Sequence, residues 1–90
     1  MNIILDYLSE LNPDMLVLPD FQEALIGYVE RCGSNALACY DIDKCIQILI
    51  ERDGMTDEEA LEYFSYNTLG AYMGENTPMF LTRIDSELFW

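Results

Sequence analysis

Apolar side chains recur at intervals of three and four residues from Ile4 to Leu11. This spacing predicts a short amphipathic helix over about residues 2–11. Pro13 ends the pattern, because proline cannot continue a helix beyond its first turn. The brief apolar run 15–18 is then expected to lie extended on the core.

Residues 24–32 fit two interpretations, the end of a helix whose first turn is 20–23 or a strand that is entered through a turn there. We favour the strand, because the Gly-Ser-Asn cluster at 33–35 has the size of a hairpin loop and the segment 36–40 beyond it is short and apolar. An antiparallel hairpin follows, and Gly27 within its first strand predicts a bulge or a close backbone approach.

The middle of the chain predicts two helices that pack as a pair. Asp41 can cap the first helix, whose apolar stripe consists of Ile42, Cys45, Ile46, Leu49 and Ile50. Gly54 can adopt the left-handed conformation that ends this helix, while Thr56 and Glu59 fit a capping box that begins the next one. The expected inner face of the second helix consists of Ala60, Leu61, Phe64, Thr68 and Ala71.

Gly70 and Gly74 weaken the far end of the second helix, and residues 78–84 then read as a strand that pairs with the hairpin. Residues 85–90 form a short acidic and aromatic tail. We therefore predict one α+β domain over residues 1–90, in which a small antiparallel sheet, made of the hairpin and the C-terminal strand, packs against a helix pair.

The net charge of the chain limits which partners it can bind. Seventeen acidic residues stand against four basic ones, with no histidine, which gives a formal net charge of -13 in 90 residues. Such a charge opposes binding to nucleic acid and to anionic membranes, and an alternative interpretation is that it only keeps a small protein soluble. The hydrophobic content of 51% excludes acidic disorder.

The three cysteines are an odd number, and residues 1–6 lack the basic and apolar segments that we would expect of a secretory leader, so we expect a reducing cytoplasm. No run of about 18 apolar residues predicts a membrane span.

The residue types present do not favour a catalytic, metal-binding or cofactor-binding site. Without histidine, the commonest base for a serine or cysteine nucleophile is missing, so we expect no enzyme and no catalytic residue. The carboxylate pairs Asp41 with Asp43 and Glu58 with Glu62 resemble helix caps and a solvated face more than an acid and base pair. The cysteine spacing does not suit zinc, and no glycine motif would hold a phosphate. We expect no cofactor and no metal.

A family resemblance covers about residues 24–78. It is carried by Tyr40-Asp41, Lys44-Cys45-Ile46, Asp53-Gly54-Met55, Glu59-Ala60, Glu62-Tyr63-Phe64, Asn67, Gly70-Ala71-Tyr72, Gly74-Glu75 and Thr77-Pro78. With these residues the chain resembles a family of small uncharacterised proteins of bacteriophages and prophages. The resemblance implies a phage accessory protein that acts inside a bacterium, and it implies no catalytic role.

Our main hypothesis is that the protein inhibits a host defence or nucleic-acid enzyme by binding it with an acidic face that mimics nucleic acid. We do not expect the helix pair to bind DNA directly as a helix–turn–helix motif. A recognition helix needs Arg, Lys, Asn or Gln toward the bases and cations toward the phosphates, whereas the second helix carries acids. The expected partner-binding residues are Asp41, Asp43, Asp57, Glu58, Glu59, Glu62, Tyr63, Tyr66 and Glu75. The partner would be a basic host protein.

Two alternatives remain open. One is a structural or adaptor module that forms a homodimer or docks through apolar surface, at the N-terminal helix or at Leu88-Phe89-Trp90. The other is a small-ligand pocket between the helix pair and the sheet, lined by Tyr40, Tyr72 and Met73.

Overall fold

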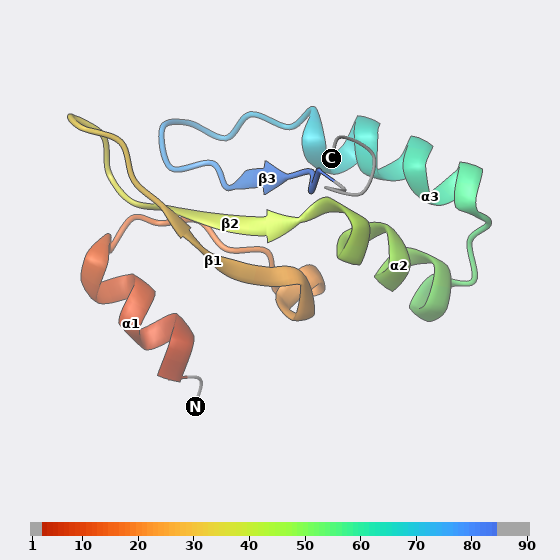
Figure 1. Cartoon of the computed structure of the whole chain (residues 1–90), viewed down its shortest axis with the longest axis horizontal. Coiled ribbons are helices and arrows are strands. Elements are labelled where there is room, and N and C mark those ends of the chain that lie inside the picture. Colours follow the sequence, from red (N-terminus) through yellow and green to blue (C-terminus); the bar gives the residue numbers. More distant parts are fainter. Residues whose placement is uncertain (1–2, 85–90) are drawn as a thin grey trace.

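A computed structural model describes residues 3–84, so the predicted tail at 85–90 lies outside the described residues. The helices and strands, in chain order, are α1 (Ile3–Leu11), η1 (Pro19–Ala24), β1 (Leu25–Val29), β2 (Leu37–Asp41), α2 (Ile42–Asp53), α3 (Asp57–Phe64), η2 (Ser65–Leu69) and β3 (Met79–Leu81). Here η1 is a short 3₁₀ helix and η2 is a π-helical turn. The prediction of an α+β fold with a short N-terminal helix and a packed helix pair is confirmed (Figure 1).

The sheet has the order β1-β2-β3 and is mixed. β1 and β2 form the predicted antiparallel hairpin, but β3 lies parallel to β2, so the prediction of a wholly antiparallel sheet is wrong. The physical reason lies in the connection: α2 and α3 carry the chain away from the end of β2 and back to the start of β3 (Figure 1). A crossover through helices brings the next strand in parallel, whereas a short loop brings it in antiparallel.

Of the two interpretations of residues 24–32, the structure confirms the strand. Leu25–Val29 is β1, and its register with β2 shifts between Leu25 and Gly27, which confirms the predicted bulge. Residues 20–23 belong to the 3₁₀ helix η1 instead of a simple turn, and Pro19 begins that helix where its missing N–H costs no hydrogen bond.

The core lies between one face of the sheet and the helices. Its buried members are Phe21, Ala24, Ala38, Tyr40, Cys45, Leu49, Ala60 and Phe64. The ring of Phe64 meets those of Phe21 and Phe80 edge to face, at centroid distances of 6.0 and 5.2 Å. These contacts join η1, α3 and β3, which are far apart in the sequence.

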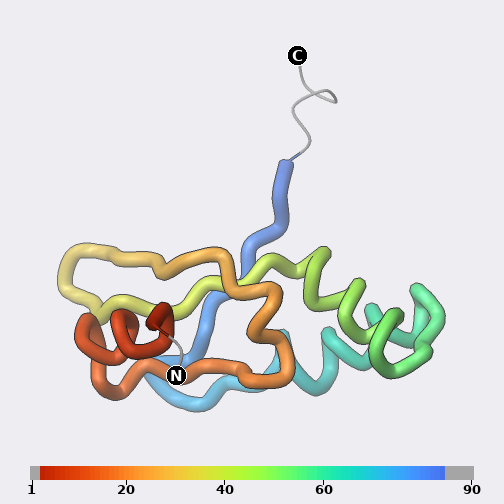
Figure 2. Tube along the Cα trace, turned by 90° about the horizontal axis from the view of Figure 1, so that it is seen from below, coloured from red at the N-terminus to blue at the C-terminus, as the bar shows by residue number. Residues whose placement is uncertain are grey.

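The segment before η1 lies extended on the core, as predicted. Met15, Val17 and Leu18 pack against the buried cluster, and the Leu18 N–H donates to the Tyr40 hydroxyl at 2.7 Å. Figure 2 shows this segment and α1 on the same side of the sheet. The Asn12 amide, which is buried, donates to the Ala36 carbonyl and thereby ties the end of α1 to the hairpin.

The predicted inner face of the second helix is only partly correct. Ala60 and Phe64 are buried, but Leu61 is 57% exposed. With 3.6 residues per turn, the stripe set by Ala60 and Phe64 leaves the intervening Leu61 directed away from it. α3 also ends at Phe64, and the wider turn η2 replaces the predicted continuation toward Ala71.

Candidate partner-binding surface

The corner between α2 and α3 is built by local hydrogen bonds that the sequence encodes. Gly54 has a φ of 70°, and its N–H donates to the Ile50 carbonyl, which ends α2. The Glu59 N–H donates to the Thr56 hydroxyl at 3.2 Å, and the Thr56 N–H donates to the Glu59 carboxylate at 3.0 Å. This capping box starts α3 with three carboxylates in its first turn, where unpaired backbone amides favour negative charge.

The outer side of α3 follows from the side that is buried. Because Ala60 and Phe64 face the core, Glu58, Glu62 and Tyr66 recur every fourth residue along the solvent side. The exposed acids and tyrosines of this helix and of the turn that follows are called the α3 surface here: Asp57, Glu58, Glu59, Glu62, Tyr63 and Tyr66. Six of the nine predicted partner-binding residues therefore lie together.

Most of the carboxylates on the α3 surface have no partner within residues 3–84. Glu59 is held by the capping box, whereas Asp57, Glu58 and Glu62 take part in no side-chain hydrogen bond or ion pair of the described residues. Tyr66 is 77% exposed and Tyr63 is 45% exposed. The helix thus presents charge and aromatic surface to solvent together.

The α3 surface is hollowed. A shallow hollow of about 360 Å³ is bounded by Met55, Glu59, Glu62, Tyr63, Tyr66 and Asn67. Two of these side chains are acids and two are tyrosines. A cationic side chain that entered the hollow would therefore meet both carboxylates and aromatic rings.

Three of the predicted residues lie elsewhere. Asp43 is exposed in the first turn of α2, at the sheet end of the helix pair, whereas Asp57 begins α3 at the far corner (Figure 1). Glu75 is exposed beside the hairpin turn, where it borders a hollow together with Gly33. Asp41 is buried. The sequence pattern grouped these acids by charge alone, and the fold separates them.

Asp41 has a structural role in the described part of the chain. Its carboxylate accepts from the Lys44 N–H at 3.3 Å as the cap of α2, and from the Arg83 guanidinium at 2.7 Å. Burial would raise the pKa of this carboxyl, but the hydrogen bonds from Arg83 and from the amides of Lys44 and Asp43 outweigh it and hold the pKa below its ordinary value. Asp41 therefore stays charged at neutral pH, with its two oxygens engaged inside the protein.

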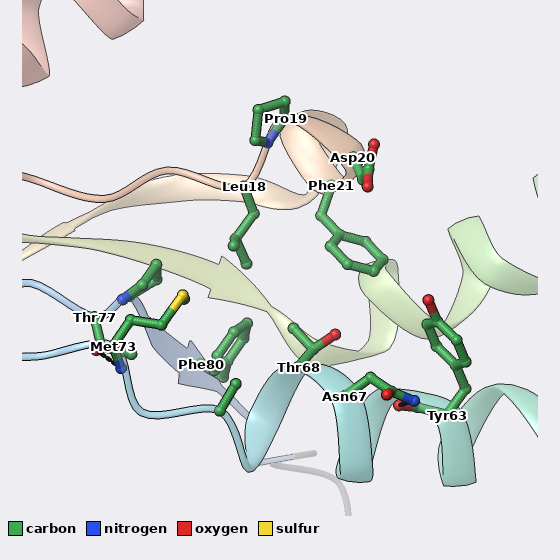
Figure 3. Close-up of a pocket in the computed structure, with 12 residues that line it drawn as sticks. Leu18, Pro19, Asp20, Phe21, Tyr63, Asn67, Thr68, Met73, Thr77 and Phe80 are labelled. Atoms are coloured by element: carbon green, nitrogen blue, oxygen red, sulfur yellow. Dashed lines mark hydrogen bonds between the residues drawn. The ribbon is translucent and has the colours of Figure 1, made fainter.

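A second hollow, about 270 Å³ in volume, lies where η1, α3, η2 and β3 meet (Figure 3). It is called the Phe21 hollow here and is lined by Leu18, Pro19, Asp20, Phe21, Tyr63, Asn67, Thr68, Ala71, Met73, Thr77, Pro78 and Phe80. Of the predicted pocket residues, only Met73 lines it. Tyr40 is buried in the core, and Tyr72 is 78% exposed and does not line the hollow.

Sequence reasoning missed the Phe21 hollow because its walls come from segments that are far apart in the chain. The two prolines that border it were the available signal, since Pro19 is the first residue of η1 and Pro78 directly precedes β3.

The cysteines are free thiols in different environments. Burial raises the pKa of Cys45 to about 12 and also raises the pKa of Cys39, so both thiols are protonated at neutral pH. Cys32 is exposed in the hairpin turn, three residues after the end of β1. Within residues 3–84, no three acidic or cysteine side chains gather as a metal site.

No family model, curated protein or solved structure matches this chain. In the part of the chain that the structure describes, no helix is long and apolar enough to cross a membrane.

Proposed function

We propose that this chain is a small phage-encoded inhibitor that acts inside a bacterium by binding a basic host protein, a nucleic-acid or defence enzyme, through the α3 surface. The observation that carries the proposal is the row of carboxylates on α3 that have no partner in residues 3–84. The phage context is supported by the sequence resemblance over residues 24–78.

The charge of the α3 surface is not balanced from within. Of the four basic residues, Arg52 pairs with Asp53 and Arg83 pairs with Asp41, so neither neutralises the acids on the outer side of α3. Uncompensated charge of one sign attracts an oppositely charged protein over several ångströms and raises its association rate.

The geometry of α3 suits a groove that normally holds nucleic acid. Glu58 and Glu62 are four residues apart, which places their Cβ atoms roughly 5–6 Å from each other on one side of the helix. Arginine and lysine side chains that line such a groove would meet successive carboxylates in place of phosphates. Tyr63 and Tyr66 add large, stiff aromatic groups of the kind that dominate binding energy at protein interfaces.

The proposal is tested by affinity capture from a bacterial lysate with three forms of the protein. One is the wild type, one carries Glu58→Lys with Glu62→Lys, and the matched control carries Asp6→Lys with Glu10→Lys on α1. Both double variants change the net charge by the same amount at exposed positions. The partner should be a basic nucleic-acid or defence enzyme that the wild type and the control inhibit.

We expect the α3 variant to lose capture and inhibition, and the wild type to lose capture as salt rises, because screening weakens exposed charge pairs. Equal loss with both double variants would mean that only net charge matters and would reject the α3 surface. Inhibition that survives reversal on α3 would reject the mechanism altogether.

Self-association through α1 is a second candidate, favoured by the exposed apolar stripe on that helix. Ile3, Tyr7 and Leu11 recur every fourth residue and are 80, 50 and 39% exposed. The solution mass of wild type and of Tyr7→Glu, each with and without residues 86–90, tests this candidate. A monomer in all four forms rejects it, whereas a dimer that Tyr7→Glu dissociates supports it.

A further inference from the structure

We propose that the Phe21 hollow is a socket for one arginine side chain of the basic partner. The inference rests on the proposed function, because it names the group through which that partner is recognised. It concerns residues outside the row of acids on α3, and it has its own test.

The size of the hollow suits a small guest, such as one long side chain. Sites for small-molecule ligands and cofactors usually measure roughly 300–1,000 Å³. The Phe21 hollow measures about 270 Å³, which is at the lower edge of that range. One long side chain, inserted from a partner that covers the mouth, fits this volume.

The interior of the hollow is apolar. Leu18, Phe21, Ala71, Pro78 and Phe80 provide its lining, and Figure 3 shows Leu18 directed toward Phe80 across it. Arginine and lysine both bury an aliphatic stem against such surface while the charged head stays near the rim. The lining residues include one acid, Asp20, and no cation, and the cation beside the hollow, Arg52, is paired with Asp53.

Two polar groups at the rim can accept hydrogen bonds from a guest that carries donors. The Asn67 amide nitrogen already donates to the Tyr63 carbonyl at 3.1 Å, which leaves the amide oxygen as an acceptor. Asp20 adds an exposed carboxylate at the rim. The Thr77 hydroxyl is already engaged, because it donates to the Gly74 carbonyl and accepts from the Met73 N–H.

The protein already binds a guanidinium beside this hollow. The Cζ atom of Arg52 lies 5.9 Å from the centroid of the Phe21 ring, and its Nη1 donates to the Asp20 carbonyl at 2.7 Å. Both Asp20 and Phe21 also line the hollow. A guanidinium is planar and weakly hydrated and stacks on aromatic rings, whereas an ammonium is compact and strongly hydrated. The socket therefore favours arginine over lysine.

The Phe21 hollow adjoins the α3 surface. Tyr63 and Asn67 border both this hollow and the shallow hollow on α3. A basic segment that lies along α3 can thus place one residue in the socket while its neighbours face the acids.

The test compares two short peptides of equal charge, one with a central arginine flanked by lysines and one with lysine at every position. Equal charge makes the pull of the α3 acids the same for both. We expect the arginine peptide to bind the wild-type chain about fivefold more tightly, the ratio that about 1 kcal/mol of guanidinium–aromatic contact gives. Ala71→Leu, which fills the socket, should bring the ratio to one.

Glu58→Lys with Glu62→Lys should weaken both peptides and leave their ratio unchanged, which separates the socket from the acidic surface. A wild-type ratio near one would overturn the socket alone.

A second measurement needs neither the variant nor the acids. N-acetyl-arginine methylamide, titrated to high concentration, should shift the NMR methyl signals of Ala71, Met73 and Thr68, and its lysine counterpart should not. Shifts that are absent, or equal for both compounds, would overturn the socket even if neither peptide binds.

Discussion

Replacing Asp41 tests whether this acid stabilises the fold. The sequence had placed it among the expected partner-binding residues. The carboxylate caps α2 through the Lys44 N–H and binds Arg83. Asp41→Ala removes both interactions. Asp41→Asn keeps one oxygen that can cap the helix, but it loses the charge, and an amide nitrogen that cannot accept replaces the oxygen that binds Arg83.

The structure sets the size of each effect. Loss of a helix cap costs about 1 kcal/mol. The Arg83 side chain is 59% exposed, so solvent screens its pairing with Asp41, and we count that interaction at about 1 kcal/mol. Asp41→Ala should therefore lower the free energy of unfolding by about 2 kcal/mol and Asp41→Asn by about 1 kcal/mol. In a domain of this size these losses correspond to Tm shifts of roughly 10 and 5 °C.

The pH dependence follows from the direction of the pKa shift. The folded-state pKa of Asp41 is lowered, so its contribution is present above the unfolded-state value of about 3.9 and is lost as pH falls through the folded-state pKa. Urea unfolding followed by circular dichroism should show a gap between wild type and Asp41→Asn at neutral pH that closes in acid.

Equal stability of the alanine and asparagine variants would refute the cap, and a gap that persists in acid would refute the charged pair with Arg83. In either case the structural role assigned to Asp41 would have to be withdrawn.

The remaining predictions concern the thiols and the core. In the native protein at mildly alkaline pH, a disulfide reagent should modify Cys32 quickly and Cys45 and Cys39 slowly, because burial raises the pKa of the latter two thiols. Fast reaction of all three thiols before unfolding would contradict the burial of Cys39 and Cys45. Phe64→Ala should cost about 3–5 kcal/mol of stability, because Phe64 is 1% exposed, whereas Leu61→Ser should change stability by less than about 0.5 kcal/mol. Denaturant titration measures both, and similar losses would contradict the orientation of α3.

The helices, the hairpin and the bulge were predictable because their signals are local. Gly54 and the capping box of Thr56 and Glu59 fix the corner between α2 and α3 through hydrogen bonds within a few residues. The parallel direction of β3 was missed, because it depends on where a crossover of two helices delivers the chain.

The part of the candidate site that one helix carries was predictable from the sequence, and the rest was not. The acids and tyrosines within α3 and η2 lie together because one helix and the turn that follows it carry them. The cap at Asp41 was also predictable, whereas the burial of Asp41 and the position of Glu75 depend on tertiary packing that no local pattern reports. Arg83, the partner of Asp41, is 42 residues away in the chain.

The most direct test of the central claim is the association rate of the captured partner with wild type and with Glu58→Lys, Glu62→Lys over a series of salt concentrations. The account predicts that the wild-type rate falls as salt rises and that the variant, compared with Asp6→Lys, Glu10→Lys, associates more slowly and with a flatter salt dependence. Identical rates and salt slopes for all three forms would contradict it.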